Sequence, residues 1–174
     1  GYTDHLVGQL RERLEAMGRW EDTLTIITAD HGEMLGERGL MGHGRPAGMY
    51  RQLIHLPLIV HGPGFPSGER SGALVQLADI TQMIAEMTGA LEGLPPTAAE
   101  RVDLRDAATG AGREYAICER GPWPEERLEK AQKENPSFDY SPMVGEILSC
   151  IRDGWHLIDA GTGATELVDK RRDP

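Results

Sequence analysis

Apolar and polar positions along the first half of the chain predict a helix, a strand, a loop, a second strand and a second helix. Residues 3–17 carry apolar side chains at spacings of three and four, which indicates an amphipathic helix. Residues 23–29 are β-branched and apolar, as in a buried strand. Residues 56–61 predict the second strand, and Asp79 is placed to cap a helix that Gly89 ends. The pattern therefore predicts an α/β unit.

The pattern changes after residue 112 to short strands separated by glycine and proline turns. The strand candidates are residues 114–118, 147–152, 155–158 and 165–168. Asp153-Gly154, between two of these candidates, is a strong signal for a hairpin turn. Residues 123–139 form a charged insert, which we expect to be loop with one or two helical turns. Residues 30–48 are rich in glycine and predict a loop with one short helix.

The composition excludes several classes of function. The chain has 174 residues, of which 39% are hydrophobic and 26% charged, as in globular proteins. Its net charge of -10 argues against nonspecific binding to nucleic acid or anionic membranes, because phosphate contacts need clustered cations. A sulfate or phosphate ester remains possible, since it needs only one local positive site. No apolar run reaches the ~18 residues that a membrane span requires.

The two cysteines, Cys118 and Cys150, stand outside any Cys-x-x-Cys pair. This spacing excludes a zinc ribbon and a thioredoxin motif. Two free, partly buried thiols are the favoured interpretation, and a single disulfide between them is the alternative.

The sharpest chemical feature is Asp30-His31-Gly32-Glu33, directly after the first predicted strand. Ligands of open α/β sheets bind beyond the carboxyl ends of the strands. Asp30 and His31 can meet one ion only if the chain turns there, and Gly32 permits such a turn. A carboxylate and a neutral imidazole suit Zn²⁺ or Mn²⁺ better than Ca²⁺. The alternative is that Asp30 caps a helix and His31 is an ordinary loop residue.

A second candidate is His43, which lies between two glycines. Its backbone can approach a ligand closely, so the imidazole can donate a proton to a leaving group or hold an anionic oxygen. A surface loop is the alternative. Tyr50, Arg51 and His55 precede the second strand and can contact a substrate, although packing is the simpler interpretation.

The order of these motifs is more specific than any one of them. After the first strand come Asp30-His31-Gly32-Glu33, Leu35-Gly36-Glu37, Gly39-Leu40, Gly42-His43-Gly44, Tyr50, His55–Val60 and Gly62-Pro63-Gly64. This order resembles the sulfatase family, which belongs to the alkaline phosphatase-like superfamily. The tail, from Cys150 to Trp155 and from Glu166 to Asp169, closing on Asp173-Pro174, is similar to the C-terminal subdomain of that family.

The resemblance implies roles for three residues. In the sulfatase family, an Asp-His or Asp-Asn pair after this strand ligates the catalytic divalent metal, so Asp30 and His31 are the expected metal ligands. The ion can be Ca²⁺, Mn²⁺, Zn²⁺ or Mg²⁺. Many members place a lysine or histidine against the ester group, and His43 matches that position, which makes it the expected catalytic residue.

The chain also departs from the family pattern. Family members carry an acidic half-site near the N-terminus and a nucleophile in a Cys/Ser-x-Pro-x-Arg setting, which is converted to formylglycine. Neither cysteine and no serine of this chain has proline two and arginine four positions later. Complete members are several hundred residues long. We therefore expect a C-terminal portion that lacks the N-terminal nucleophile region and is inactive alone.

These expectations define an α/β fold with two parts. Residues 1–110 are expected to be the C-terminal part of the alkaline phosphatase-like sheet-and-helix domain, and residues 111–174 a small antiparallel β subdomain with a packed helix. The parent protein is expected to hydrolyse small-molecule sulfate esters. The alternatives are a phosphatase, phosphodiesterase or phosphonate hydrolase of the same superfamily, or a non-catalytic metal- or partner-binding protein. We also expect self-association, or pairing with the missing N-terminal portion, through an exposed sheet edge.

Overall fold

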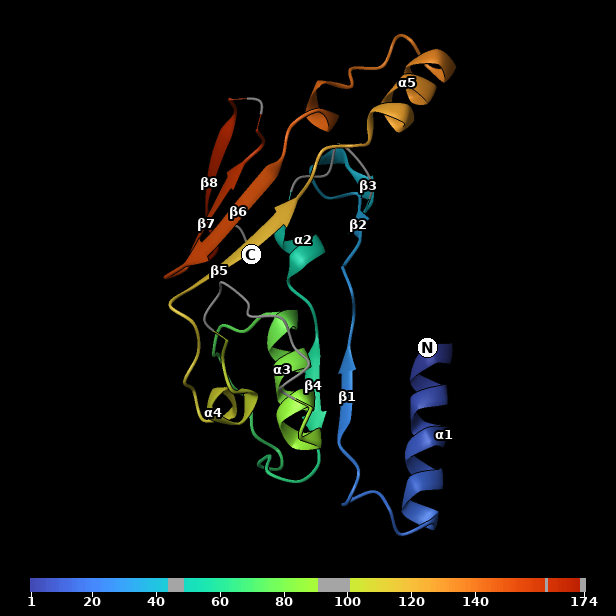
Figure 1. Cartoon of the computed structure of the whole chain (residues 1–174), viewed down its shortest axis with the longest axis vertical. Helices are drawn as coiled ribbons and strands as arrows, with labels where there is room; N and C mark the ends of the chain where they lie inside the picture. Colours follow the sequence, from blue (N-terminus) through green and yellow to red (C-terminus); the bar gives the residue numbers. More distant parts are fainter. Residues whose placement is uncertain (44–48, 91–100, 162, 173–174) are drawn as a thin grey trace. The chain divides into compact units, whose positions relative to one another are not determined.

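The chain forms two compact units in the computed structural model (Figure 1), which describes residues 1–43, 49–90, 101–161 and 163–172. Unit 1 contains residues 1–29, 57–73 and 78–111, and unit 2 contains residues 30–56, 74–77 and 112–174. The division into domains at residue 110 stays a prediction, and the contacts group residues 30–56 with the C-terminal part of the chain. Gly44 and Asp173-Pro174, which belong to the resemblance, lie outside the described residues.

Unit 1 contains the two strands and two helices that the first half of the sequence predicts, and one helix more. Its elements are α1 (Tyr2–Ala16), β1 (Thr25–Thr28), β4 (Leu58–His61), α3 (Leu77–Thr88) and α4 (Leu104–Ala108). β1 and β4 pair antiparallel, with Ile27 opposite Ile59. Gly89 ends α3 with φ 72°, as predicted. The short helix α4 was not predicted, although Asp103 caps it by accepting a hydrogen bond from the backbone N–H of Arg105 at 2.8 Å.

The predicted capping role of Asp79 is wrong. Asp79 is the third residue of α3, and its side chain is completely buried. Its carboxylate accepts a hydrogen bond from the backbone N–H of Val102 at 3.0 Å. The carboxylate therefore ties the segment before α4 to α3, because a buried carboxylate needs such a partner.

The apolar surface of unit 1 is less buried than the sequence pattern indicates. No residue of α1 is buried, and Leu6 and Leu10 are 44% and 57% exposed. Three residues of β1 are half-buried and Thr28 is exposed. Among the described residues β1 pairs with β4 on one edge, so its other edge carries no strand. This is less burial than expected for an interior strand.

The chain is expected to self-associate, because an unpaired strand edge and exposed apolar side chains recruit other chains. Light scattering at several concentrations should show an average mass above 19.1 kDa that rises with concentration. Leu10→Gln should shift the distribution towards the monomer, whereas Glu12→Gln, a neutral change on the same helix, should not. A monomer at every concentration would contradict this prediction.

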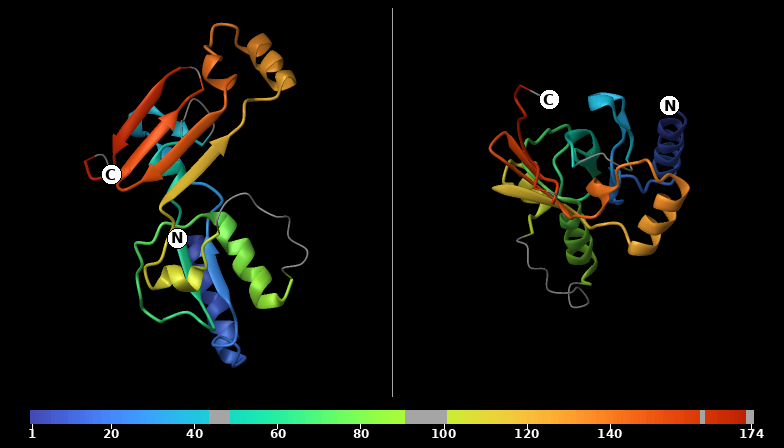
Figure 2. Two further views of the ribbon diagram at one scale, coloured as in Figure 1. Left: turned by 60° about the vertical axis from the view of Figure 1, so that its left-hand side comes forward. Right: turned by 90° about the horizontal axis from the view of Figure 1, so that it is seen from above.

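Unit 2 is built around a four-stranded antiparallel sheet (Figure 2). Its strands, in spatial order, are β5 (Tyr115–Arg120), β6 (Ile147–Arg152), β7 (Trp155–Asp159) and β8 (Thr165–Asp169). An insert between β5 and β6 contains α5 (Glu125–Glu134) and a 3₁₀ turn (Ser141–Met143), and it extends beyond one end of the sheet. All four predicted strands are confirmed. The helix of the insert, α5, has ten residues and is longer than the one or two turns predicted.

The register of this sheet tests the predicted hairpin turn at Asp153-Gly154 and the possible disulfide between the two cysteines. Asp153 and Gly154 have φ of 48° and 81° and join β6 to β7, as a type I′ hairpin turn requires. Cys118 lies opposite Ser149, whereas Cys150 lies opposite Ile117. Because neighbouring residues of a strand point to opposite faces, the two cysteines face away from each other. Both thiols are free, so the disulfide alternative is wrong. Burial raises the pKa of the Cys118 thiol.

Unit 2 also contains a small hairpin where the sequence predicts a loop. β2 (Met34–Leu35) and β3 (Met41–Gly42) pair antiparallel around a 3₁₀ turn (Glu37–Gly39), and α2 (Arg51–Ile54) follows them. Met34 is completely buried against Leu53. Strands of two residues are too short to show a hydrophobic period, which explains why the hairpin was missed.

No helix among the described residues has the length and apolar character to cross a membrane.

Candidate metal and catalytic site

Asp30 is the first residue of the candidate site along the chain, and it is also the first residue of unit 2. Asp30 follows β1 in the chain, and its side chain is 89% exposed. Its Oδ1 accepts a hydrogen bond from the backbone N–H of His31 at 2.9 Å. This hydrogen bond and the nearby imidazole of His31 lower the pKa of Asp30. The carboxylate is therefore ionised at neutral pH and accessible to solvent.

The hydrogen bonds of His31 determine which of its nitrogens can bind a cation. Nδ1 lies 2.9 Å from the carbonyl oxygen of Gly32. A carbonyl oxygen only accepts, so Nδ1 carries a proton, and when the ring is neutral the lone pair is on Nε2. Nε2 lies 3.7 Å from Oδ2 of Asp30. Metal-bound histidines usually donate their other N–H to a carbonyl or carboxylate in this way.

Gly32 holds this loop in place through close backbone packing. Its N–H donates to the carbonyl oxygen of Leu53 at 2.9 Å. A Cβ atom at position 32 would lie 1.9 Å from the carbonyl oxygen of Gln52. Gly32 has no positive φ, unlike twelve other glycines of the described chain. The sequence predicted that Gly32 is needed for its backbone freedom in a turn. The structure shows instead that position 32 has no room for a side chain.

His43 lies beside His31 and is held by a carboxylate that the sequence analysis left without a role. The two imidazole rings are 4.2 Å apart at an angle of 34°. Nδ1 of His43 lies 3.0 Å from Oε2 and 3.2 Å from Oε1 of Glu33. Glu33 and His43 continue the β2–β3 register by one pair, since Met34 lies opposite Gly42. Glu33 could be assigned from the sequence only if the hairpin and its register were known.

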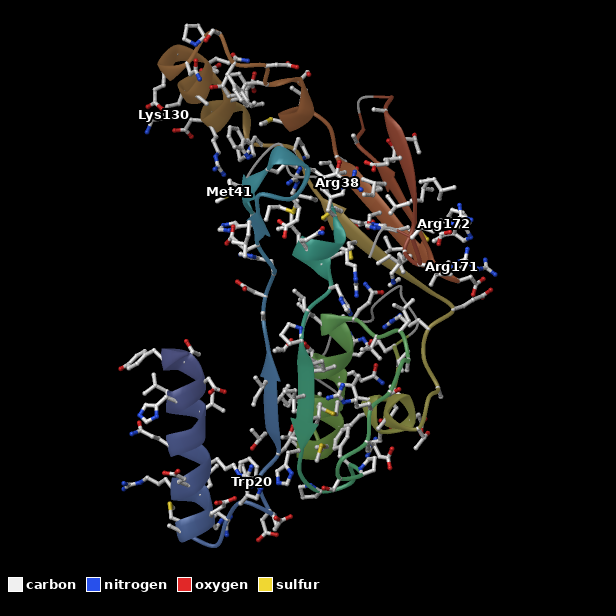
Figure 3. All side chains as sticks on the ribbon, turned by 180° about the vertical axis from the view of Figure 1, so that it is seen from behind. Trp20, Arg38, Met41, Lys130, Arg171 and Arg172 are labelled. Carbon is white, nitrogen blue, oxygen red and sulfur yellow. The ribbon has the colours of Figure 1, made fainter. Side chains whose placement is uncertain are left out.

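The other predicted contact residues mainly pack unit 2. The hydroxyl of Tyr50 donates to Oε2 of Glu166 at 3.1 Å, and Nη1 of Arg38 lies 2.8 Å from Oε1 of the same carboxylate. The guanidinium of Arg38 also covers the ring of Tyr50 at 4.4 Å. These contacts join the tip of the β2–β3 hairpin to β8, and Figure 3 shows Arg38 and Met41 on this hairpin. Arg51 begins α2, and burial lowers the pKa of His55, which follows that helix.

Asp30 and His31 fit one divalent cation. Two ligand atoms, each 2.0–2.2 Å from the same metal, can be no more than about 4.4 Å apart, and Oδ2 and Nε2 are 3.7 Å apart. One of these atoms is anionic and the other presents a lone pair, which suits Zn²⁺ and Mn²⁺. No group of three or more His, Cys, Asp or Glu side chains within the described ranges could hold a metal. Two ligand atoms fill only part of the coordination shell of such an ion, which takes four or more.

Comparison with known proteins places this chain in a family. Residues 1–90 match the family model described as Sulfatase. Choline-sulfatase of Rhizobium meliloti (strain 1021) is 29% identical over 175 residues, covering 99% of this chain and 30% of that protein. Arylsulfatase K of Mus musculus is 29% identical over 122 residues, covering 70% of this chain and 21% of that protein.

The fold agrees with this match. The structure of a phosphonate monoester hydrolase from Silicibacter pomeroyi superposes with a TM-score of 0.72 at 27% identity, covering 97% of this chain and 32% of that one. The architecture is thus that of the alkaline phosphatase-like hydrolases, and within that class the chain belongs to the sulfatase family. The chain spans about a third or less of the length of each of these relatives. The predicted family and fold class are confirmed.

Proposed function

We propose that Asp30 and His31 supply two ligands to the divalent metal of a sulfatase-like ester hydrolase, and that His43 acts on the ester beside them. The observation that carries this proposal is the facing pair of Oδ2 of Asp30 and Nε2 of His31 at 3.7 Å. Two electron-rich atoms facing each other at this distance repel unless a proton or a cation lies between them. The hydrogen bond from Nδ1 to the carbonyl of Gly32 directs the lone pair to Nε2.

A divalent cation bound there would polarise the ester group and favour the ionised form of an attacking oxygen. The remaining roles belong to the protein. Asp30 keeps its negative charge because the N–H of His31 stabilises it. The imidazole of His31 is oriented by the Gly32 carbonyl, and Gly32 is itself held by Leu53.

His43 is the proposed proton donor to the leaving oxygen of the ester. Its Nδ1–H donates to the carboxylate of Glu33, which leaves Nε2 to face a ligand. A proton carried at Nε2 would pass to the ester oxygen as the bond to sulfur or phosphorus breaks. Glu33 orients the ring through this hydrogen bond. The ring of His43 lies against that of His31 at a tilt of 34°, so the proposed proton donor lies next to the proposed metal ligand.

The proposed reaction is the hydrolysis of a sulfate ester, supported by the match of residues 1–90 to the sulfatase family. The alternative is a phosphonate or phosphate ester, favoured by the likeness to a phosphonate monoester hydrolase at 27% identity. We further propose that residues outside these 174 complete the metal shell and provide the nucleophile. The support is that the chain holds no Cys/Ser-x-Pro-x-Arg sequence and that its relatives are about three times as long.

Metal binding by this chain should be weak and should depend on Asp30. With two protein ligands, we expect dissociation constants of about 10⁻⁴ M or higher for Mn²⁺ and Zn²⁺, because firm protein sites use four or more ligands. Isothermal calorimetry with Mn²⁺, Zn²⁺ and Ca²⁺ measures this affinity. Asp30→Asn should remove the binding, and Glu129→Gln, on exposed α5, should not.

Two outcomes would contradict the proposal. Sub-micromolar binding that Asp30→Asn abolishes would show that the chain already holds a complete site with further ligands. Binding that survives in Asp30→Asn at full strength would show that the metal binds elsewhere, among the many surface carboxylates of this acidic chain.

A further inference from the structure

One face of the β2–β3 hairpin carries both the proposed chemistry and a pair of exposed apolar side chains. Residues two apart on a strand point to the same face, so Leu35 shares a face with Glu33, and Met41 shares it with His43. Leu35 lies directly opposite Met41 in the hairpin register. The residue between Glu33 and Leu35, Met34, points the other way and is completely buried.

The Leu35–Met41 pair is unusually exposed for apolar residues next to a site. Leu35 is 72% exposed and Met41 is 71% exposed. Single exposed apolar residues are common on protein surfaces, but these two are a cross-strand pair in continuous register with Glu33 and His43. From the start of the hairpin towards its tip, this face therefore carries His31, then the Glu33–His43 pair, then the Leu35–Met41 pair.

This order sets the direction in which a substrate would lie. In the proposed function, the charged ester group lies at Asp30, His31 and His43, and His43 protonates the departing oxygen. The alcohol part attached to that oxygen must then extend past His43. The next groups on that face are the isobutyl group of Leu35 and the thioether of Met41, which offer apolar contact and almost no hydrogen bonding.

We propose that Leu35 and Met41 bind the alcohol part of the substrate and select an extended apolar group there, such as an aryl ring, over a group with little apolar area, such as a methyl group or a hydroxyl-rich sugar. This inference rests on the proposed function and deepens it. A sugar would lose hydrogen bonds to water at this pair without regaining them from the protein. An aryl ring would bury apolar area and make favourable contacts with the sulfur of Met41.

The hairpin face is held in position by contacts on its other side and at its tip. Met34 is anchored in the apolar cluster with Leu53. Arg38, at the tip, has a φ of 54° and pairs with Glu166 at 2.8 Å. A left-handed conformation of a residue other than glycine persists only where its surroundings enforce it. The apolar pair is therefore presented from a supported hairpin next to His43.

A binding experiment on the 174-residue chain tests this inference without requiring turnover. In the presence of excess Mg²⁺, NMR titrations should compare 4-nitrophenyl sulfate with methyl sulfate, which share the charged group and differ in the apolar part. The wild type should bind the aryl ester about tenfold more tightly. The double variant Leu35→Gln/Met41→Gln should reduce this preference to about twofold or less. Leu167→Gln, in the exposed Leu157–Leu167 pair of β7 and β8, should leave the preference at about tenfold.

The outcomes separate this inference from the proposed function. A wild type without preference for the aryl ester, or a preference that persists in the double variant, would overturn the role of Leu35 and Met41. If methyl sulfate binds equally to the wild type and to Asp30→Asn and His43→Ala variants, the proposed site itself is wrong. A preference lost in the Leu167→Gln control would also overturn the inference, because it would place the aryl group on the outer face of the sheet.

Discussion

Replacing Gly32 by alanine is expected to destabilise unit 2 by about 3 kcal/mol or more, since overpacking at a site that cannot relax costs 1–3 kcal/mol and sometimes more. The added Cβ would lie 1.9 Å from the carbonyl oxygen and 2.9 Å from the carbonyl carbon of Gln52. Both are backbone atoms, so no side-chain rotation can relieve the clash. Separating the two segments would also break the hydrogen bond from Gly32 to Leu53, at a further cost of about 1 kcal/mol.

Gly121→Ala is the matched control for this prediction. Gly121 also lies in unit 2, its φ is not positive, and a Cβ there would meet no atom within 4 Å. We expect its effect to stay within about 0.5 kcal/mol, as for most surface changes. Urea unfolding followed by tryptophan fluorescence measures both variants. A Gly32→Ala protein as stable as the Gly121→Ala protein would contradict the close approach of the loop to α2.

The second large effect concerns catalysis. Residues 1–174 are expected to show no detectable turnover of 4-nitrophenyl sulfate or 4-nitrophenyl phosphate, with or without added divalent metal. Covalent catalysis of this kind needs an activated oxygen nucleophile, and neither cysteine has the sequence setting for conversion to formylglycine. Proton donation by one histidine is worth about 10²–10⁴-fold, whereas enzymes of slow hydrolyses supply ten or more powers of ten.

Multiple-turnover assays with both esters measure this prediction. His43→Ala is the informative variant, since His43 is the proposed proton donor. A rate well above background that falls in His43→Ala would show that this chain is an enzyme by itself. A rate that is unchanged in His43→Ala would point to a contaminating hydrolase.

The parts of the fold that could be predicted from the sequence have long or repetitive local signals. The strands of the four-stranded sheet are each five or six residues long and are separated by turn residues such as Asp153-Gly154. The hairpin of β2 and β3 has two residues per strand, and α4 has five residues. Such short elements are stabilised by contacts with distant residues, such as that of Met34 with Leu53, and not by local periodicity.

The residues of the candidate site likewise fall into those that the sequence predicts and those that only the structure shows. Asp30, His31 and His43 could be selected because their motifs follow one another in a family-specific order, and the structure brings all three together. Glu33 was missed as the partner of His43, because its role depends on the hairpin register. The true constraint on Gly32 is the nearby backbone of Gln52, a contact between segments twenty residues apart that no local pattern encodes.

The position of a bound metal tests the central claim most directly. Adding small amounts of paramagnetic Mn²⁺ to the isotopically labelled chain should broaden the NMR signals of Asp30 and His31 first, and those of His43 and Glu33 next. Asp30→Asn should remove this localised broadening. Broadening centred on other carboxylates, such as Glu125 and Glu126 at the start of α5, or broadening at His31 that persists unchanged in Asp30→Asn, would contradict the assignment of Asp30 and His31 as metal ligands.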